Sequence, residues 1–323
     1  MIQEKVNLRQ SRDFGETFNA SVRLLRQNFR VLFLSVISLA GPFVLAASIA
    51  GAYYQANVLQ NTMSQMNEIG HGTFNPLQML LSQFDYHYAI FMVAISIAQM
   101  VLMSTVYAVI VTYQEKGPGN FSVTDVAGCM GKNIANLIIS YILITLITAV
   151  PIAILVGGIY VIGQDSAALA ILLAILIILA LLVILPPFLW QFSAIYLSVM
   201  QPNTTLVKGF ARPFRIMSGN FWWTWVIVVC TTIAVALIGA IFTIPQASYQ
   251  MVVMYGNSGD DIPMAYMIIT TICTFLTTIV YSVMHLVFGV HYYSLVEKRE
   301  GAGMIDMINE IGQAPNGNDN LHH

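Results

Sequence analysis

The chain has 323 residues, of which 57% are hydrophobic and only 9% are charged, and its formal net charge is −2. Soluble domains carry roughly 25% charged residues, so this composition predicts an integral membrane protein. The small net charge gives no indication of a nucleic-acid partner or of an acidic substrate. The three cysteines, Cys129, Cys230 and Cys273, are widely spaced, which argues against a disulfide framework and against a cysteine metal site.

Six apolar runs are each long enough to cross a bilayer, which takes about 20 residues of α-helix. None of them contains Asp, Glu, Lys or Arg. We therefore predict an all-α integral membrane fold with six transmembrane helices, over residues 31–54, 86–114, 134–162, 167–200, 221–245 and 263–293. We expect a kink at Gly41-Pro42 and an end of the fifth span at Pro245. The fourth run is longer than a bilayer requires, so it should tilt, kink at Pro186-Pro187 or project from the membrane.

The stretch at residues 204–221, TTLVKGFARPFRIMSGNF, recurs in degenerate form at two earlier places. When the copies are aligned on their Asn, each has apolar residues at spacings of four, three and four, which is one face of an α-helix. The apolar positions are Phe210, Phe214, Met217 and Phe221 in this copy, Phe18, Val22, Leu25 and Phe29 in the first, and Val123, Ala127, Met130 and Ile134 in the second.

Because a long apolar run follows each copy, we predict three pseudo-repeats, each an interfacial amphipathic helix followed by a transmembrane hairpin. The repeats cover residues 14–114, 119–200 and 204–295 and form a single membrane domain. A polar lead over residues 1–13, which we expect to be mobile, precedes the domain. A polar cytoplasmic tail over residues 296–323 follows it.

The basic residues indicate the orientation. With six spans and a cytoplasmic N-terminus, all 13 Lys and Arg residues fall in cytoplasmic segments and none in an outer loop. The positive-inside rule then predicts cytoplasmic N- and C-termini, and we assign the protein to a bacterial cytoplasmic (inner) membrane. The amphipathic helices would lie on its inner face and contact lipid headgroups, unless they pack on the bundle as cytosolic helices. The candidate headgroup contacts are Arg23, Arg26, Arg30, Lys132, Lys208, Arg212 and Arg215.

The three copies end in Gln27-Asn28-Phe29, Lys132-Asn133-Ile134 and Gly219-Asn220-Phe221. With this thrice-repeated lead-in, residues 14–295 resemble a family of bacterial six-span proteins. This family comprises the membrane domain associated with glycerophosphodiester phosphodiesterases and stand-alone relatives of unassigned function. The resemblance implies a shared membrane scaffold. The fused enzymes add a soluble catalytic barrel, and this chain has no segment long enough to hold one.

One polar face stands out in the sixth span. Thr270, Thr274, Thr277, Tyr281 and His285 follow one another at helical spacing and should face the bundle interior. Their hydroxyl groups either bond to the same or to neighbouring helices as packing contacts, or line a cavity. His285 and His291 are six residues apart, on different faces of a helix, and no third ligand is near in sequence, so we expect no metal site and no cofactor.

These features favour a non-catalytic membrane module that engages membrane lipid, and possible further partners are another protein or a second copy of the chain. The alternative is a transporter or channel for a neutral or amphiphilic solute, since no Asp, Glu, Lys or Arg lies within the spans to relay protons or bind a charged substrate. An intramembrane enzyme has the least support, because only His285 and His291 could titrate at membrane depth.

Overall fold

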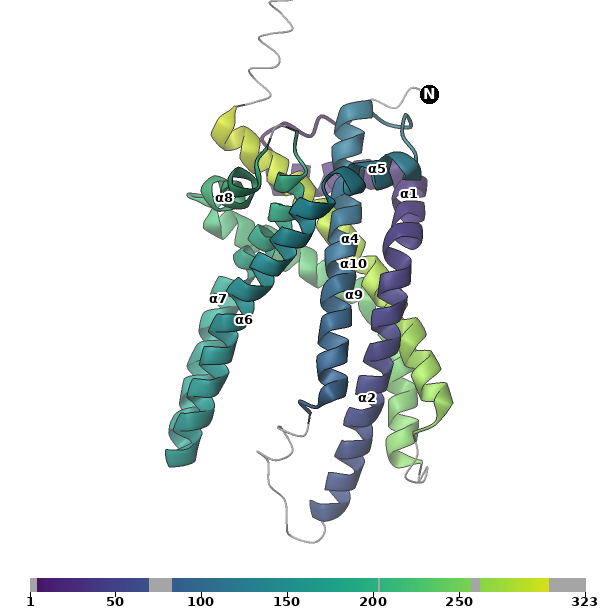
Figure 1. Ribbon diagram of the computed structural model, residues 1–323, viewed down its shortest axis with the longest axis vertical. Helices are drawn as coiled ribbons and strands as arrows, with labels where there is room; N and C mark the ends of the chain where they lie inside the picture. The colour runs from purple at the N-terminus through teal and green to yellow at the C-terminus, as the bar shows by residue number, and fades with distance from the viewer. Residues whose placement is uncertain (1–4, 70–82, 203, 257–261, 302–323) are drawn as a thin grey trace, which may run out of the picture.

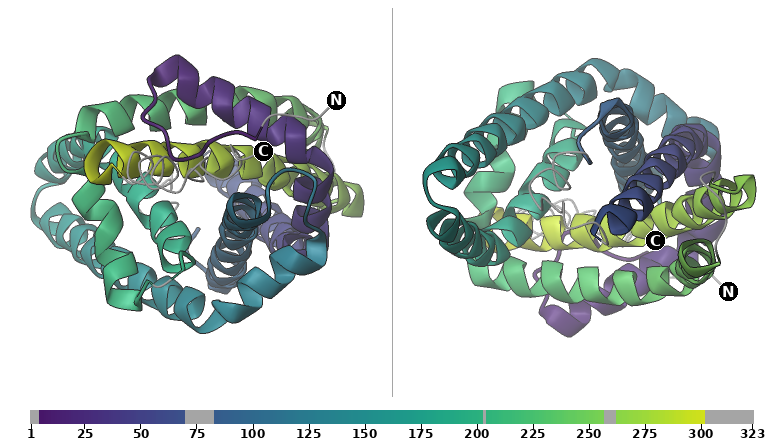
Figure 2. Two further views of the ribbon diagram at one scale, coloured as in Figure 1. Left: turned by 90° about the horizontal axis from the view of Figure 1, so that it is seen from above. Right: turned by 90° about the horizontal axis from the view of Figure 1, so that it is seen from below.

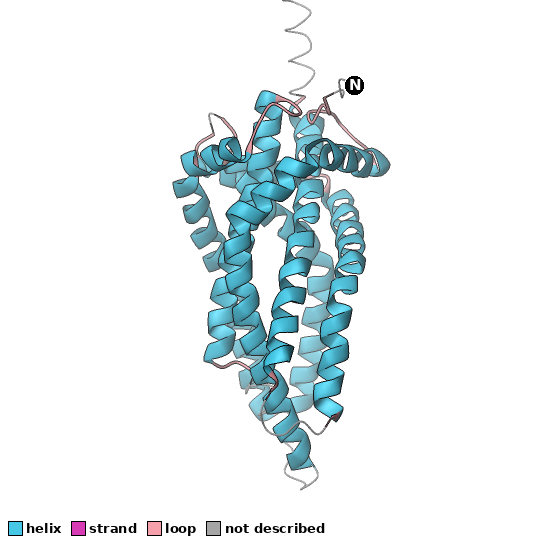
Figure 3. Cartoon of the chain, turned by 90° about the vertical axis from the view of Figure 1, so that its right-hand side faces the viewer, coloured by secondary structure: helices cyan, strands magenta, loops and turns pink. Residues whose placement is uncertain are grey.

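The computed structural model describes residues 5–69, 83–202, 204–256 and 262–301. Over these residues all regular structure is helical, and the loops lie at the ends of the bundle (Figure 3). Six helical stretches are long and apolar enough to cross a membrane, as expected for a multi-pass membrane protein. The elements are α1 (Phe14–Ser35), a π-helical turn (Val36–Ala40), α2 (Gly41–Ile69), α4 (Tyr86–Lys116), α5 (Val123–Lys132), α6 (Ile134–Asp165), α7 (Ala167–Val199), α8 (Leu206–Met217), α9 (Phe221–Tyr255) and α10 (Met264–Glu300).

The long helices run side by side, and the short helices α5 and α8 lie across one end of them (Figure 1). Residues 5–13, α1 and the C-terminal ends of α4 and α10 lie towards this same end. Together with α5 and α8, these segments hold all 13 Lys and Arg residues of the chain. We call this end the basic end, and the opposite one the far end.

An Asn separates each amphipathic segment from the apolar helix that follows it. Asn28 interrupts α1 with φ −122° and ψ 15°. Asn133 lies between α5 and α6 with φ −107° and ψ 7°, and Asn220 precedes α9 with φ −121° and ψ 23°. The side-chain amides of Asn28 and Asn133 each donate to the carbonyl four residues earlier, at 3.0 Å. These bonds satisfy carbonyls that the interruption would leave without a partner.

The C-terminal half of α10 is the core of the basic end. Every residue from His285 to Val296 is buried, so this part of the helix has no exposed face. It is enclosed by α1, α4, α7, α8 and α9, and Figure 2 shows α10 running through the interior of the bundle. Gly289 allows the close approach of α4, because a Cβ at this position would lie 2.4 Å from Ile110 Cδ1.

Tryptophan side chains join α7 to its neighbours through backbone carbonyls. Pro186 has no N–H, so the Leu182 carbonyl, four residues earlier, loses its helical hydrogen bond. The Trp225 indole of α9 donates to this carbonyl at 3.3 Å. Trp190 of α7 donates in the same way to the Phe288 carbonyl of α10, at 3.2 Å. A carbonyl left unpaired in hydrocarbon costs several kcal/mol, so these donors favour this arrangement of the three helices.

The irregularity expected at Gly41-Pro42 is a π-helical turn over the five preceding residues, Val36–Ala40. A π turn widens the helix where the ring of Pro42 would otherwise meet the carbonyl of Ser38. The chain therefore passes from α1 into α2 without a loop.

Two helices extend beyond the ends expected from the sequence. The prediction that the fifth span ends at Pro245 is wrong for the helix, since α9 continues through Pro245 to Tyr255. Likewise α2 continues beyond residue 54 to Ile69. The two extensions pack together, with Leu59 of α2 and Val253 of α9 buried in one apolar cluster, and the amide of Gln246 hydrogen-bonds to Gln55. Tertiary packing thus outweighs the single hydrogen bond that a proline removes.

The N-terminal lead is also more ordered than expected. From Lys5 onward it is packed on the basic end, where Val6 and Leu8 are buried. The Val6 amide donates to the Tyr113 hydroxyl at 2.8 Å, and the Arg12 amide donates to Ser294 Oγ at 3.0 Å. The expectation of a mobile lead is therefore wrong for residues 5–13. Of the predicted tail, residues 296–300 complete α10, and residues 302–323 lie outside the described part of the chain.

The hairpin of α6 and α7 stands apart from the other helices towards the far end (Figure 1). Nearly all side chains at residues 142–159 and 171–185 are exposed, and most of them are apolar. An apolar surface on every face of a helix suits contact with lipid acyl chains. This hairpin is thus anchored to the bundle mainly through its basic-end half.

The indole contact can be tested by Trp225→Phe, which keeps the aromatic ring and removes the donor to the Leu182 carbonyl. We expect a loss of about 1–3 kcal/mol in the free energy of unfolding, because the Leu182 carbonyl is left without its donor, measured by reversible denaturation in mixed micelles. Trp222→Phe is the matched control, because Trp222 makes ring contacts but no hydrogen bond with a described residue. Equal losses in the two variants would contradict the assignment.

Candidate functional site

The short helix α8 has one face that packs and one face that carries positive charge. Its buried face holds Gly209, Pro213 and Ile216 and contacts α7. Gly209 permits this contact, because a Cβ there would lie 2.8 Å from Val199 Cγ1 and 3.1 Å from Val199 Cα. The basic residues of α8, Lys208, Arg212 and Arg215, follow one another at spacings of four and three, so they share a second face, about 100° around the helix from the buried one.

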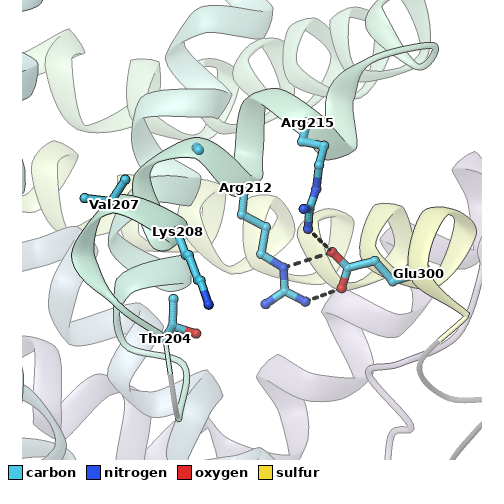
Figure 4. Close-up of a pocket in the computed structure, with 7 residues that line it drawn as sticks. Thr204, Val207, Lys208, Arg212, Arg215 and Glu300 are labelled. Carbon is cyan, nitrogen blue, oxygen red and sulfur yellow. Dashed lines mark hydrogen bonds and ion pairs between the residues drawn. The ribbon is translucent and has the colours of Figure 1, made fainter.

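This basic face borders a pocket of about 440 Å³ at the basic end. The pocket is enclosed by α8, by the link that precedes it and by the last residue of α10. Its lining residues are Thr204, Val207, Lys208, Ala211, Arg212, Arg215 and Glu300 (Figure 4). Three of the seven residues predicted to contact lipid headgroups therefore meet at one site.

Glu300 neutralises part of the positive charge of this pocket. Arg212 donates to Glu300 Oε1 through Nε at 3.2 Å and to Oε2 through Nη2, and Arg215 Nη2 donates to Oε1 at 2.9 Å. Arg212 also lies over the ring of Tyr292, 5.9 Å from its centroid. Burial is the largest influence and disfavours the charged form of Arg212, but the hydrogen bonds to Glu300 and the electrostatic attraction of Tyr292, Glu300 and Tyr293 together outweigh it and raise the pKa of the guanidinium above its usual value.

The pocket retains an excess of positive charge. Its three cations face one carboxylate, and Lys208 makes no hydrogen bond or ion pair with any described residue. Figure 4 shows the Lys208 amine beside Thr204, on the other side of the Arg212 guanidinium from Glu300. Arginine and lysine side chains arranged around a concave site are suited to phosphate and carboxylate groups.

The remaining predicted headgroup residues lie elsewhere on the basic end. Arg23, Arg26 and Arg30 are exposed on α1, and Lys132 is exposed at the C-terminal end of α5. None of the four forms a hydrogen bond or ion pair with another residue in the described ranges. Their contact with headgroups stays a prediction.

The polar face of the sixth span is distributed along α10. Thr270 and His285 are buried, while Thr274, Thr277 and Tyr281 are partly buried. His285 Nδ1 lies 3.3 Å from Ser193 Oγ of α7, and Ser193 hydrogen-bonds to the Tyr107 hydroxyl of α4. At the end of this face nearest the basic end, His285 therefore links α10 to α7 and, through Ser193, to α4. The pocket on α8 has other lining residues, and a cavity along the Thr270–His285 face stays a prediction.

His291 belongs to a separate set of contacts. Thr224 Oγ1 of α9 lies 3.1 Å from His291 Nε2, and the Trp190 ring of α7 is 5.3 Å away between centroids. The two histidines thus have separate partners, although both contact α7. Among the described residues, no three His, Cys, Asp or Glu side chains gather as metal ligands do.

Sequence reasoning missed two features of these sites. Glu300 follows the apolar run and resembles a solvent-exposed residue of the tail, and its partners Arg212 and Arg215 are 88 and 85 residues earlier. Tyr107 and Ser193 lie in different spans from His285, and the sequence holds no signal that brings the three together.

The helix α5 is fixed to α4 by charge. Lys116 Nζ donates to Asp125 Oδ1 at 2.7 Å, and Asp125 Oδ2 accepts from the Ser122 amide at 2.8 Å. The hydrogen bond from Lys116 is the largest cause that holds the pKa of Asp125 at about 2, followed by the Ser122 amide. The charged carboxylate therefore caps the first turn of α5 and ties it to the end of α4.

The chain matches no protein-family model, no curated protein and no solved structure. The functional argument consequently rests on the geometry of the sites themselves.

Packing of α8 on α7 is open to a direct test with Gly209→Ala. The added methyl group would meet Val199 side-chain and backbone atoms, so we expect a loss of about 1–3 kcal/mol in unfolding free energy. Gly128→Ala in α5 is the control, since a Cβ there meets nothing within 4 Å. If Gly209→Ala is as stable as Gly128→Ala, α8 does not pack as described.

Asp125→Asn tests the tie between α5 and α4 through pH. A carboxyl with a depressed folded pKa stabilises the fold above its unfolded pKa, about 3.9, and this contribution is lost as pH falls through the folded pKa of about 2. The wild type should melt at a higher temperature than the variant at pH 6, and the difference should shrink between pH 4 and pH 2. A difference independent of pH would exclude this role of the charge.

Proposed function

We propose that the protein is a non-catalytic, multi-pass protein of the bacterial cytoplasmic membrane that binds anionic membrane lipid at its basic end. The main support is the convergence of Lys208, Arg212 and Arg215 on one pocket. The pocket lies at the end that holds all 13 basic residues of the chain. We infer that this end faces the cytoplasm, following the positive-inside rule.

The electrostatics of such a surface favour anionic headgroups. Each Lys or Arg near an anionic leaflet contributes about 1 kcal/mol of attraction. The basic residues of α1 and α5 add to the attraction outside the pocket, while the exposed apolar residues Phe29 and Phe33 of α1 suit the acyl boundary below the headgroups. We therefore propose that the pocket selects the lipid and that α1 and α5 hold the basic end against the membrane surface.

We also propose the three-repeat architecture and the scaffold resemblance as the framework of this function. The support is the common backbone conformation of Asn28, Asn133 and Asn220. Each of these residues connects a short amphipathic segment at the basic end to a long apolar helix. Such a repeat would place three interfacial helices around the same membrane face.

A second candidate function is passage of a neutral or amphiphilic solute. The observation that favours it is the separation of the α6–α7 hairpin. In the most apolar 18-residue stretches of α6 and α7, only 0% and 6% of the residues are buried. An opening towards lipid on this side would admit an amphiphile from the bilayer. Transfer of a fluorescent lipid analogue between leaflets of proteoliposomes would support this candidate, and transfer at the rate of protein-free vesicles would remove it.

Arg212→Gln/Arg215→Gln tests lipid binding at the pocket. We expect at least a tenfold loss of bound phosphatidylglycerol, because about 1 kcal/mol is lost per charge, measured by native mass spectrometry from nanodiscs of defined composition. Lys298→Gln/Arg299→Gln removes the same charge from the same end outside the pocket and should lose less. Glu300→Gln should bind several-fold more, since the competing carboxylate is removed. Equal losses in both double variants would contradict a role for the pocket.

A further inference from the structure

The net charge of the α8 pocket and the number of its unused hydrogen-bond donors indicate which kind of phosphate group it binds. A carboxylate has two oxygens, and in Glu300 both are already used by Arg212 and Arg215. Lys208 makes no hydrogen bond or ion pair with any described residue. With Glu300 in place, the lining residues therefore carry two uncompensated positive charges and at least one unused cationic donor.

We propose that this pocket selects a phosphate monoester over a phosphate diester, with Lys208 as the discriminating residue. The inference rests on the proposed function, whose site it shares. A phosphate monoester has three terminal oxygens and a charge of about −1.5 to −2 at pH 7. A phosphate diester, the link found in phosphatidylglycerol, has two non-bridging oxygens and a single negative charge. The monoester thus compensates both excess charges, whereas the diester leaves one uncompensated.

The partial burial of the pocket strengthens the effect of this one-charge difference between monoester and diester. The side chains of Arg212 and Glu300 are 23% and 25% exposed, so water screens charges there less than at an open surface. Arg215 is 64% exposed and is more strongly screened. The unbalanced charge that a diester leaves would therefore lie beside the shielded Arg212 guanidinium, next to the exposed Lys208 side chain.

The shared chemistry of the ligand has two possible sources. One is a lipid that ends in a phosphate monoester, such as phosphatidic acid. The other is a water-soluble phosphate monoester, such as glycerol 3-phosphate. The exposed side chain of Val207 on the pocket wall favours the lipid, because it would meet the first groups of an acyl chain.

The test compares phosphatidic acid with phosphatidylglycerol, both offered to the full chain in nanodiscs with phosphatidylcholine as the bulk lipid. At pH 7.5 we expect about fivefold more phosphatidic acid retained, as one charge contributes about 1 kcal/mol. At pH 5.5, below the second pKa of the monoester near 6, the monoester has lost most of its second charge and the preference should fall below about twofold. The charged groups facing the ligand are Lys208, Arg212, Arg215 and Glu300, with Tyr292 behind Arg212.

Lys208→Gln removes the unused cation from an exposed position and leaves the ion pairs of Glu300 in place. We expect the preference for phosphatidic acid at pH 7.5 to drop to about twofold, while phosphatidylglycerol retention changes little. Lys298→Gln is the matched control and should keep the wild-type preference. Equal retention of the two lipids by the wild type, or an unchanged preference in Lys208→Gln, would overturn the inference.

Failure of the proposed function gives a different result, since neither anionic lipid would then be retained above phosphatidylcholine. The source of the ligand is settled by adding millimolar glycerol 3-phosphate to the wild type. If it displaces phosphatidic acid and binds by calorimetry in a manner that depends on Lys208, the site takes a soluble phosphate monoester. If phosphatidic acid stays bound, the ligand is the lipid.

Discussion

The structure depends on the burial of the C-terminal half of α10 on all sides. Every residue from His285 to Val296 is buried, and α10 contacts α1, α2, α4, α7, α8 and α9. Helix packing in a membrane gains little from hydrophobic transfer and relies on close contact and interhelical hydrogen bonds. Gly289 provides the close contact, and His285, His291 and the Phe288 carbonyl provide the hydrogen bonds.

The buried half of α10 also determines where the functional groups lie. Because α10 continues in register to Glu300, the carboxylate is delivered to the basic face of α8. The α8 helix is held in place by Gly209 against α7 and by the ion pairs with Glu300. The lead segment closes the same end, where the backbone amide of Arg12 donates to the hydroxyl group of Ser294. A stable core at one end therefore supports a charged surface, while α6 and α7 extend from it into lipid.

Proline in this bundle changes hydrogen bonding more than it changes helix ends. Pro186 frees a carbonyl on α7 that Trp225 satisfies, and Pro245 lies within a helix that continues for ten further residues to Tyr255. In water a proline often ends a helix because solvent can satisfy the freed groups. In hydrocarbon a donor from another helix must satisfy the freed group. The helix continues past the proline where packing stabilises the extension, as the contact of Leu59 with Val253 does here.

The sequence by itself determined the membrane class, the six apolar helices and the positions of the amphipathic segments, because helical period and charge segregation are local properties of the chain. It also indicated Lys208, Arg212 and Arg215 as candidate contacts of lipid headgroups. Tertiary structure decided the rest. The pairing of Glu300 with this face, the contact of His285 with Tyr107 and Ser193, and the docking of residues 5–13 join segments that are far apart in sequence. No local pattern encodes such contacts, because they follow from how the helices surround α10.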